Sequence, residues 1–183
     1  RMAVLLVTTT SRRSRRSTSC CVLGVVARRG KVVHFEAYGK RNLATGEPME
    51  KDTIFRIYSM TKPITAVAAM QLFAQGKFHL SNSTEKFVPE LAGLNVLDEQ
   101  GLLVDTENPV TMHQLLNHMA GFSYGFVPLT DLVDAKKVQA DLWAAKDLDE
   151  FARCVVKLPL KLQPGTKYNY SIAVDLTGLV VQR

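Results

Sequence analysis

Few cysteines occur in this sequence, three in 183 residues. Cys20 and Cys21 are adjacent and Cys154 stands alone, so the chain has neither a CxxC pair nor a disulfide framework. This usage favours a reducing compartment, and hence a cytoplasmic location. The four histidines form no HExxH motif, and His113 and His118, five positions apart, fall on different faces of a helix. These absences predict that the protein holds no metal ion.

Long hydrophobic runs are also missing. No apolar stretch approaches the roughly 18 residues that a membrane-spanning helix needs, because Arg, Gln or Gly interrupts each candidate. The 46% hydrophobic content and the length of 183 residues are typical of a single globular domain with a real core. We therefore expect one domain and no membrane span.

Acidic residues are absent from the first 31 positions, which hold eight basic residues, whereas the remainder holds 15 basic and 17 acidic residues. The net charge of +6 thus comes from the N-terminal stretch. A nucleic-acid-binding surface needs basic residues clustered on a folded face. The near-neutral body argues against nucleic acid as a partner.

Residues 1–20 form a basic, Ser/Arg-rich leader, and residues 21–183 form the predicted domain. Such a leader cannot bury apolar surface, so we expect it to be disordered. Arg and Ser without acids are compatible with an organellar transit peptide. A basic tail, or sequence foreign to the domain, is the simpler interpretation.

The body of the chain begins with a predicted β-hairpin. Residues 22–27 and 31–38 are rich in β-branched residues and are separated by a turn that contains Gly30. A loop follows, and "IFRI", residues 54–57, is a candidate short strand. The Ala-rich, largely apolar residues 61–75 predict a buried helix that ends at Gly76.

The start of this helix carries a Ser-x-x-Lys pair, Ser59 and Lys62. Pro63 is tolerated essentially only in the first turn of a helix, which places Ser59 at the helix N-terminus. There, the helix dipole favours a developing alkoxide on Ser59 and disfavours the protonated form of Lys62. A neutral lysine could then accept the seryl proton. The alternative is a capping serine and a lysine whose charged end reaches solvent.

A second Ser-x-x-Lys pair, Ser83 and Lys86, lies in the polar stretch "HLSNSTEKFVPEL". No apolar helix follows it to desolvate the lysine. We interpret Ser81 or Ser83 as the cap of a short helix.

The stretch "LQPGTKYNYSIAVDLTGLVV" supplies a further candidate group. Pro164 and Gly165 indicate a turn, and Ser171 is a candidate N-cap for a helix that begins near Ile172. Tyr170, delivered by this turn beside a lysine, could act as a general base with a lowered phenol pKa. Core tyrosines with backbone partners are the alternative.

These motifs together resemble, in sequence and order, the serine hydrolases of the β-lactamase and penicillin-binding-protein family, in particular the esterase-like branch related to class C β-lactamases. The resemblance rests on "ARRGKVVHFEAYG", "DTIFRIYSMTKPITAVAAM", "LLNHMAGFSYGF" and "PGTKYNYSIAVDLTG". It implies that Ser59 is the acylated nucleophile, Lys62 its activating lysine and Tyr170 the tyrosine of the second motif. Ile172 stands where class C β-lactamases have asparagine. This departure favours carboxylesterase-like chemistry over β-lactamase or D-alanyl peptidase activity.

The resemblance implies two-step acyl transfer to and from a small-molecule ester without a cofactor. Phe122, Tyr124 and Phe126, in a loop that borders the family's cleft, could form an apolar substrate pocket, or they could be ordinary core aromatics. We expect Gly121 to end a helix that Thr111 caps, and we interpret His118 as structural.

The implied fold is an α/β (α+β) β-lactamase-like domain. Its partial antiparallel sheet comes from the N-terminal hairpin and packs on the buried nucleophile helix, followed by a mostly helical region. The C-terminal strands, the terminal helix and the third motif of the family, Lys-Thr-Gly or His/Trp-x-Gly, are absent from the sequence given. Since that motif supplies an oxyanion donor, the second hypothesis is a truncated, catalytically incompetent fragment or an acyl-binding relic.

Overall fold

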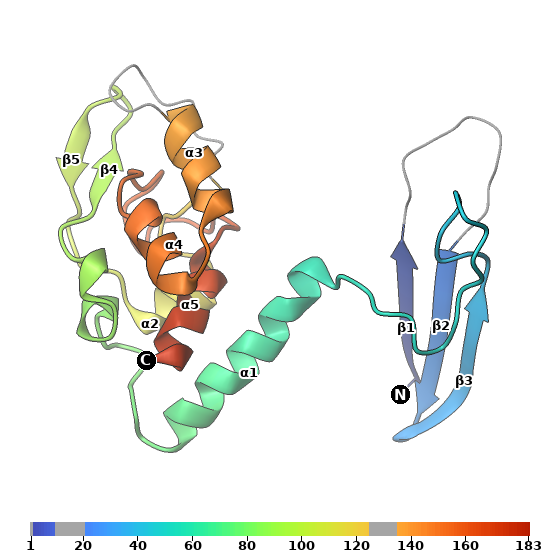
Figure 1. Cartoon of the computed structure of the whole chain (residues 1–183). Coiled ribbons are helices and arrows are strands. Elements are labelled where there is room, and N and C mark those ends of the chain that lie inside the picture. Colours follow the sequence, from blue (N-terminus) through green and yellow to red (C-terminus); the bar gives the residue numbers. More distant parts are fainter. Residues whose placement is uncertain (1, 10–20, 125–134) are drawn as a thin grey trace. The chain divides into compact units, whose positions relative to one another are not determined.

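A computed structural model describes residues 2–9, 21–124 and 135–183 of the chain. The chain divides into two compact units, Arg1–Ser59 and Met60–Arg183. The first unit contains the strands drawn in blue in Figure 1, and the second contains the helices drawn from green to red.

The first unit is built on a three-stranded antiparallel sheet in the order β1-β2-β3. Its strands are β1 (Met2–Thr9), β2 (Cys21–Arg28) and β3 (Lys31–Tyr38). The predicted hairpin is confirmed as β2 and β3, and its two turn residues, Arg29 and Gly30, have φ values of 50° and 76°. Positive φ at both positions is what a two-residue hairpin turn needs to match the strand twist.

The expectation of a wholly disordered leader was wrong for β1, which pairs with β2 from Met2↔Arg28 to Thr9↔Cys21. The run Ala-Val-Leu-Leu-Val has the composition of a strand, and pairing satisfies the backbone groups at an edge of the hairpin. Residues 1 and 10–20 lie outside the described part of the chain. The predicted strand over residues 54–57 is also absent from the structure, because this segment runs irregularly with Ile54 in solvent.

The second unit begins around the predicted nucleophile helix. A 3₁₀-helix, η1 (Tyr58–Met60), leads directly into α1 (Thr61–Ala74). Gln75 is the C-cap of α1, and Gly76 follows with φ of 72°, so the helix stops before Gly76 as predicted. The later elements are η2 (Thr84–Lys86), η3 (Pro89–Leu91), β4 (Asn95–Leu97), β5 (Leu103–Asp105), α2 (Met112–Leu116), α3 (Ala135–Ala144), α4 (Leu148–Val155) and α5 (Ala173–Gln182).

The core of the second unit is centred on α5, in which six of the ten residues are buried. α1 lies beside α5 (Figure 1), and α2 and α4 also contact it. The expectation that α1 is buried was wrong: only Ala69 is fully buried, while Ile64 and Val67 are 62% and 59% exposed. α1 is apolar on most sides, but among the described residues only one of its faces is packed.

Helix caps follow the local sequence. Thr111 and Gln114 form a complete capping box at α2. Ser83 Oγ accepts a hydrogen bond from the Glu85 N–H at the start of η2, so the second Ser-x-x-Lys pair begins with a capping serine, as interpreted.

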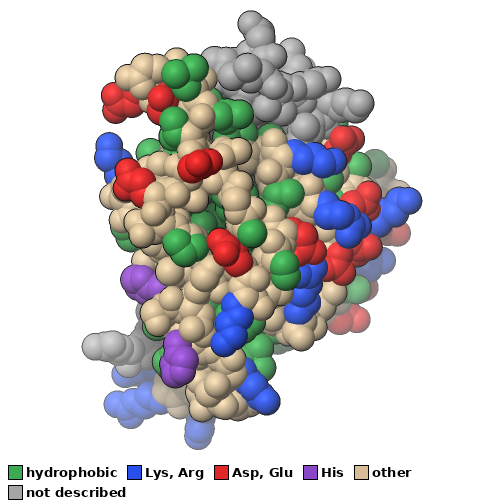
Figure 2. All heavy atoms as spheres, turned by 90° about the vertical axis from the view of Figure 1, so that its left-hand side faces the viewer, with side chains coloured by type: hydrophobic (Ala, Val, Ile, Leu, Met, Phe, Trp, Pro, Cys, Tyr) green, Lys and Arg blue, Asp and Glu red, His purple; other side chains and the backbone are tan. Residues whose placement is uncertain are grey.

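The surface carries charges of both signs. Figure 2 shows acidic and basic side chains interspersed with apolar ones over one face of the molecule. Across the described residues, the helices are too short or too polar for any of them to cross a bilayer.

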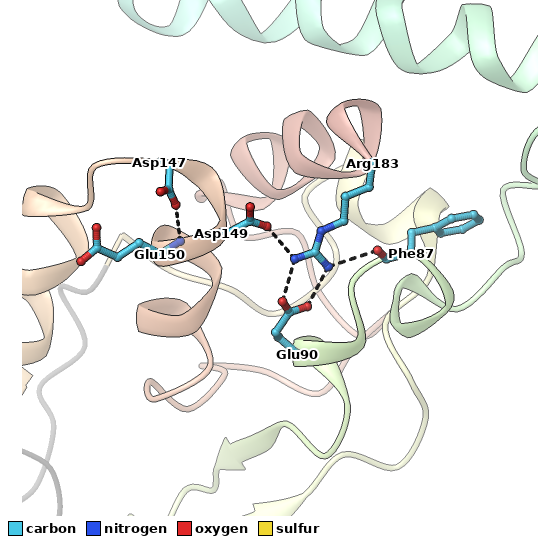
Figure 3. A network of polar contacts seen from close by, with 6 residues as sticks. All are labelled: Phe87, Glu90, Asp147, Asp149, Glu150 and Arg183. Atoms are coloured by element: carbon cyan, nitrogen blue, oxygen red, sulfur yellow. Dashed lines mark hydrogen bonds and ion pairs between the residues drawn. The ribbon is translucent and has the colours of Figure 1, made fainter.

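An ion network joins three elements of the second unit (Figure 3). The Arg183 guanidinium, at the end of α5, donates to both carboxylate oxygens of Glu90 at 2.8 and 2.6 Å, and to Asp149 of α4 at 2.6 Å. It also donates to the Phe87 carbonyl oxygen at 3.4 Å. Hydrogen bonds from Arg183 lower the pKa of Glu90 to about 2.

Candidate functional site

Ser59 lies in the turn that precedes α1. The helix begins at Thr61, its N-cap residue is Met60, and Pro63 occupies the first turn, which confirms the predicted position of Ser59 at the helix N-terminus. Ser59 is exposed and is not the capping residue. The residue before it, Tyr58, has φ of 44°, a left-handed conformation that is costly for a bulky residue and typical of functional turns.

The Lys62 side chain lies against two neighbouring tyrosine rings. Its Nζ is 5.0 Å from the ring centroid of Tyr170 and 5.7 Å from that of Tyr124. The ammonium group also makes side-chain hydrogen bonds with both phenols. The structure therefore brings together two residues, Lys62 and Tyr170, that are 108 positions apart in the sequence.

The charge state of Lys62 differs from our expectation. Partial burial disfavours its charged form, but the hydrogen bonds with Tyr124 and Tyr170, together with the Asp175 carboxylate, outweigh burial and raise the pKa of Lys62. We expected the helix N-terminus to favour a neutral lysine. Two phenol oxygens that accept from the ammonium reverse that preference, so Lys62 is a cation at neutral pH.

Tyr124 links Lys62 to a residue that sequence reasoning missed. Its ring centroid is 5.8 Å from that of Tyr170 and 6.4 Å from that of Trp143, on which it stacks at an interplanar angle of 15°. Burial and a hydrogen bond with Tyr170 raise the pKa of Tyr124, although Lys62 opposes the shift. Trp143, the single tryptophan of the sequence, is exposed on α3. That it is the single tryptophan was the one feature of the sequence that could have drawn attention to this residue.

The His118 ring also contacts the Tyr170 ring. The two ring centroids are 4.6 Å apart, and the ring of Tyr168 lies 5.9 Å from that of His118. His118 is buried, and this burial, followed by the charge of Lys62, lowers its pKa. Asp175, on the first turn of α5, is a further ionisable neighbour that sequence reasoning missed, and burial raises the pKa of its carboxyl group.

The loop after α2, residues 117–124, lies in close contact with residues 160–171, here called the tyrosine segment. α2 ends at Leu116, so the expectation that Gly121 ends this helix was wrong. Gly121 instead adopts φ of 83° where its Cα faces the Leu162 carbonyl oxygen, which a Cβ atom would overlap. Its own carbonyl oxygen accepts from the Lys161 N–H at 2.8 Å. Glycine is required here for the backbone contact, not for a helix end.

The three residues predicted to bind substrate have different positions in the structure. Tyr124 lies at Lys62, as described above. The side chain of Phe122 is only 3% exposed and belongs to the core, which favours the alternative interpretation for this residue. Phe126 lies outside the described residues. Within the described part of the chain, no group of three His, Cys, Asp or Glu side chains is arranged to hold a metal ion.

The arrangement can move protons at its centre. An ammonium group that donates to two phenol oxygens stabilises negative charge on either oxygen. The phenolate form of a tyrosine held in this way can accept a proton from a neighbouring hydroxyl and return it later. The turn that carries Ser59 leads directly into the helix that carries Lys62.

Comparison with known proteins gives consistent matches. Esterase EstB of Burkholderia gladioli is 33% identical over 172 residues, which cover 88% of this chain and 40% of that protein. Lovastatin esterase of Penicillium rubens is 33% identical over 165 residues, with 85% and 40% covered. The chain thus spans about 40% of the length of the curated relatives that it matches.

Solved structures agree on the fold. EstCE1, described as a hydrolase with promiscuous acyltransferase activity, superposes with a TM-score of 0.69 at 23% identity, over 98% of this chain and 40% of that one. Simvastatin synthase (LovD) of Aspergillus terreus gives a TM-score of 0.61 at 26% identity, over 82% and 39%. A family model described as beta-lactamase matches residues 21–183. The chain therefore belongs to the beta-lactamase family and has a β-lactamase-like fold, as its motifs predicted.

Proposed function

We propose that this chain carries the catalytic groups of a serine hydrolase that cleaves carboxylic esters through an acyl-enzyme. The observation that carries the proposal is the position of the Lys62 ammonium beside the phenols of Tyr124 and Tyr170, at the start of the helix that Ser59 precedes. The similarity to proteins named esterases supports ester bonds as the substrate class.

In the acylation step, Ser59 Oγ attacks the ester carbonyl carbon and its proton passes to the oxygen of Tyr170, which starts as the phenolate. Because Lys62 is charged, its role is to stabilise the negative charge on that oxygen, not to accept the proton itself. The Ser59 backbone N–H, at a helix N-terminus, donates to the oxyanion. Collapse of the tetrahedral intermediate breaks the ester C–O bond, and the alcohol leaves with the proton from Tyr170.

In the deacylation step, a water molecule attacks the acyl carbon while Tyr170 accepts one of its protons. The acid is released and the proton returns to Ser59 Oγ. No electron transfer occurs in either step, and the two steps sum to ester plus water giving acid plus alcohol.

Ile172 favours esters over β-lactams. It occupies the N-cap position of α5, and its side chain is buried in the core. It therefore presents no amide to a substrate at the position where class C β-lactamases carry asparagine. We expect turnover of short p-nitrophenyl esters and no turnover of cephalosporins.

Active-site labelling tests the proposal. The folded chain is treated with a fluorophosphonate, and the modified peptide is identified by mass spectrometry. We expect an adduct on Ser59 that Ser59→Ala abolishes. Ser83→Ala is the matched control, since it removes the serine of the other Ser-x-x-Lys pair and should leave labelling unchanged.

The outcomes separate the candidate functions. Folded protein without a Ser59 adduct would refute the proposal for this chain and favour an incompetent or acyl-binding fragment. Faster hydrolysis of a cephalosporin than of p-nitrophenyl acetate or butyrate would favour β-lactamase or peptidase activity instead.

A further inference from the structure

His118 accepts hydrogen bonds from the backbone N–H groups of both residues that flank Tyr170. Its backbone carbonyl oxygen accepts a hydrogen bond from the Asn169 N–H at 2.8 Å. Its ring Nδ1 accepts one from the Ser171 N–H at 3.2 Å. The imidazole ring also lies against the Tyr170 ring, with 4.6 Å between centroids. His118 thus holds Tyr170 in two ways: through the two residues next to Tyr170 in the sequence, and through contact between the two rings.

The second of these hydrogen bonds defines the protonation state of His118. A peptide N–H can only donate, so Nδ1 must carry no proton, and a neutral imidazole then carries its proton on Nε2. Burial and the nearby Lys62 cation both favour this neutral form. The ring is therefore suited to act as a permanent acceptor at this position.

Tyr170 needs such support because its own packing is limited. Its side chain is 42% exposed, whereas the following residue, Ser171, is buried. Ser171 Oγ in turn accepts from the Ala173 N–H at the start of α5. The orientation of Tyr170 therefore depends on how the backbone of residues 169–171 is held more than on burial of its ring.

The backbone of His118 is itself adapted to the contact. Its φ of 60° is left-handed, which is uncommon for a residue other than glycine, although His, Asn and Asp are enriched there. The turn that follows α2 and contains this conformation places both the carbonyl oxygen and the ring of His118 toward the tyrosine segment. Strain of this kind persists where the surrounding contacts hold it.

We propose that His118 is a positioning residue for Tyr170: by holding the Asn169 and Ser171 peptides, it sets the phenol oxygen at the Lys62 ammonium. This role rests on the proposed function of Tyr170 as the proton acceptor. His118 does not touch the reacting atoms, so it acts only through the orientation of Tyr170.

The kinetic test compares His118→Ala with His118→Asn. Alanine removes the ring acceptor, whereas asparagine places Oδ1 near the position of Nδ1 and tolerates a positive φ. We expect His118→Ala to lower kcat on a p-nitrophenyl ester about 10²-fold, as small misplacements of catalytic groups do, with little change in KM. His118→Asn should recover at least about tenfold of that loss. His113→Ala, an exposed histidine on α2, is the control and should match the unmodified chain.

A second readout does not depend on activity. Hydrogen exchange of the Ser171 amide, followed by NMR, should be faster in His118→Ala by at least about tenfold, and His118→Asn should restore protection. If Ser59 is never acylated, the proposed function fails, and this measurement still decides whether His118 holds the tyrosine segment.

Two results would overturn the inference. One is an unchanged kcat in folded His118→Ala with an active unmodified chain. The other is unchanged Ser171 exchange in that variant. If His118→Ala does not fold, His118→Gln replaces it, since its side-chain oxygen reaches beyond the Nδ1 position. Equal kcat and Ser171 exchange in His118→Gln and His118→Asn would then contradict the proposal.

Discussion

At the residue scale, the most informative group is Lys62. Its position in the sequence suggested a neutral base, but its two phenol partners keep it charged. The same Ser-x-x-Lys spacing recurs at Ser83 and Lys86, where the serine caps a 3₁₀-helix. The spacing alone therefore does not define the chemistry. The two tyrosines next to the Lys62 ammonium do, because its charge can stabilise negative charge on their oxygens.

Substitution of Lys62 by Gln tests whether the ammonium stabilises negative charge on the tyrosine oxygens. Lys62 lowers the pKa of Tyr124 against the effect of burial, so Lys62→Gln should move the phenol titration to higher pH, measured from tyrosinate absorbance. We also expect kcat on a p-nitrophenyl ester to fall by about 10²–10⁴, the usual contribution of a proton-transfer group. Lys86→Gln is the control. A phenol titration that stays in place would argue against the Lys62 contacts.

At the element scale, the loop of residues 117–124 and the tyrosine segment of residues 160–171 hold each other in place. The Gly165 N–H donates to the Met119 carbonyl oxygen and the Lys161 N–H to that of Gly121, both at 2.8 Å. The Asn169 side-chain amide donates to the Phe122 carbonyl oxygen. The absence of a Cβ atom at Gly121 permits this close backbone contact, so the positions of both segments depend on one glycine.

Gly121→Ala should therefore be strongly destabilising. The new Cβ overlaps the Leu162 carbonyl and the backbone is left-handed, so we expect the free energy of unfolding to fall by about 2–4 kcal/mol. Gly76→Ala is the matched control. It has φ of 72° but no atom within 4 Å of its Cβ position, and its cost should be about 1 kcal/mol. Urea denaturation measures both, and equal losses would contradict the close contact at Gly121.

At the scale of the whole molecule, the helical unit is joined across its surface by the Arg183 network. Arg183, Glu90 and Asp149 come from α5, η3 and α4, and their side chains are only partly exposed. Bidentate guanidinium–carboxylate geometry makes such a pair stronger than a typical surface ion pair. We expect this network to contribute to the free energy of unfolding, and it shares no residue with the groups proposed for catalysis.

The network predicts a defined acid sensitivity. The pKa of Glu90 is about 2 in the folded chain against 4.5 for the free side chain, so its contribution is complete above pH 4.5 and is lost as pH falls toward 2. After allowance for solvent screening, Glu90→Gln should lower the free energy of unfolding by about 1–2 kcal/mol at pH 7.

The difference between Glu90→Gln and the unmodified chain should shrink between pH 4.5 and 2, because the unfolded chain binds a proton at Glu90 over this range while the folded chain does so only near pH 2. Urea denaturation across this range tests the expectation. Glu107→Gln, an exposed glutamate in the same unit, should change stability by less than about 0.5 kcal/mol. A pH-independent difference for Glu90→Gln would show that the charge of Glu90 is not the cause.

The sequence by itself determined the features that depend on neighbouring residues. The turn at Arg29 and Gly30, the helix limits at Pro63 and Gly76, and the capping box at Thr111 all rest on local backbone preferences. The motifs that identify the family are equally local, which is why the family and its fold could be predicted from them.

Only the tertiary structure decided the features that join distant residues. The pairing of β1 with β2, the core position of Phe122, the stacking of Trp143 on Tyr124 and the contacts of His118 with Asn169 and Ser171 have no signal in local spacing. The charge of Lys62 belongs with them, because a pKa depends on every group brought within reach of the side chain. Short-range preferences fix the turns and helix ends of this protein, and long-range packing fixes the electrostatics of its candidate site.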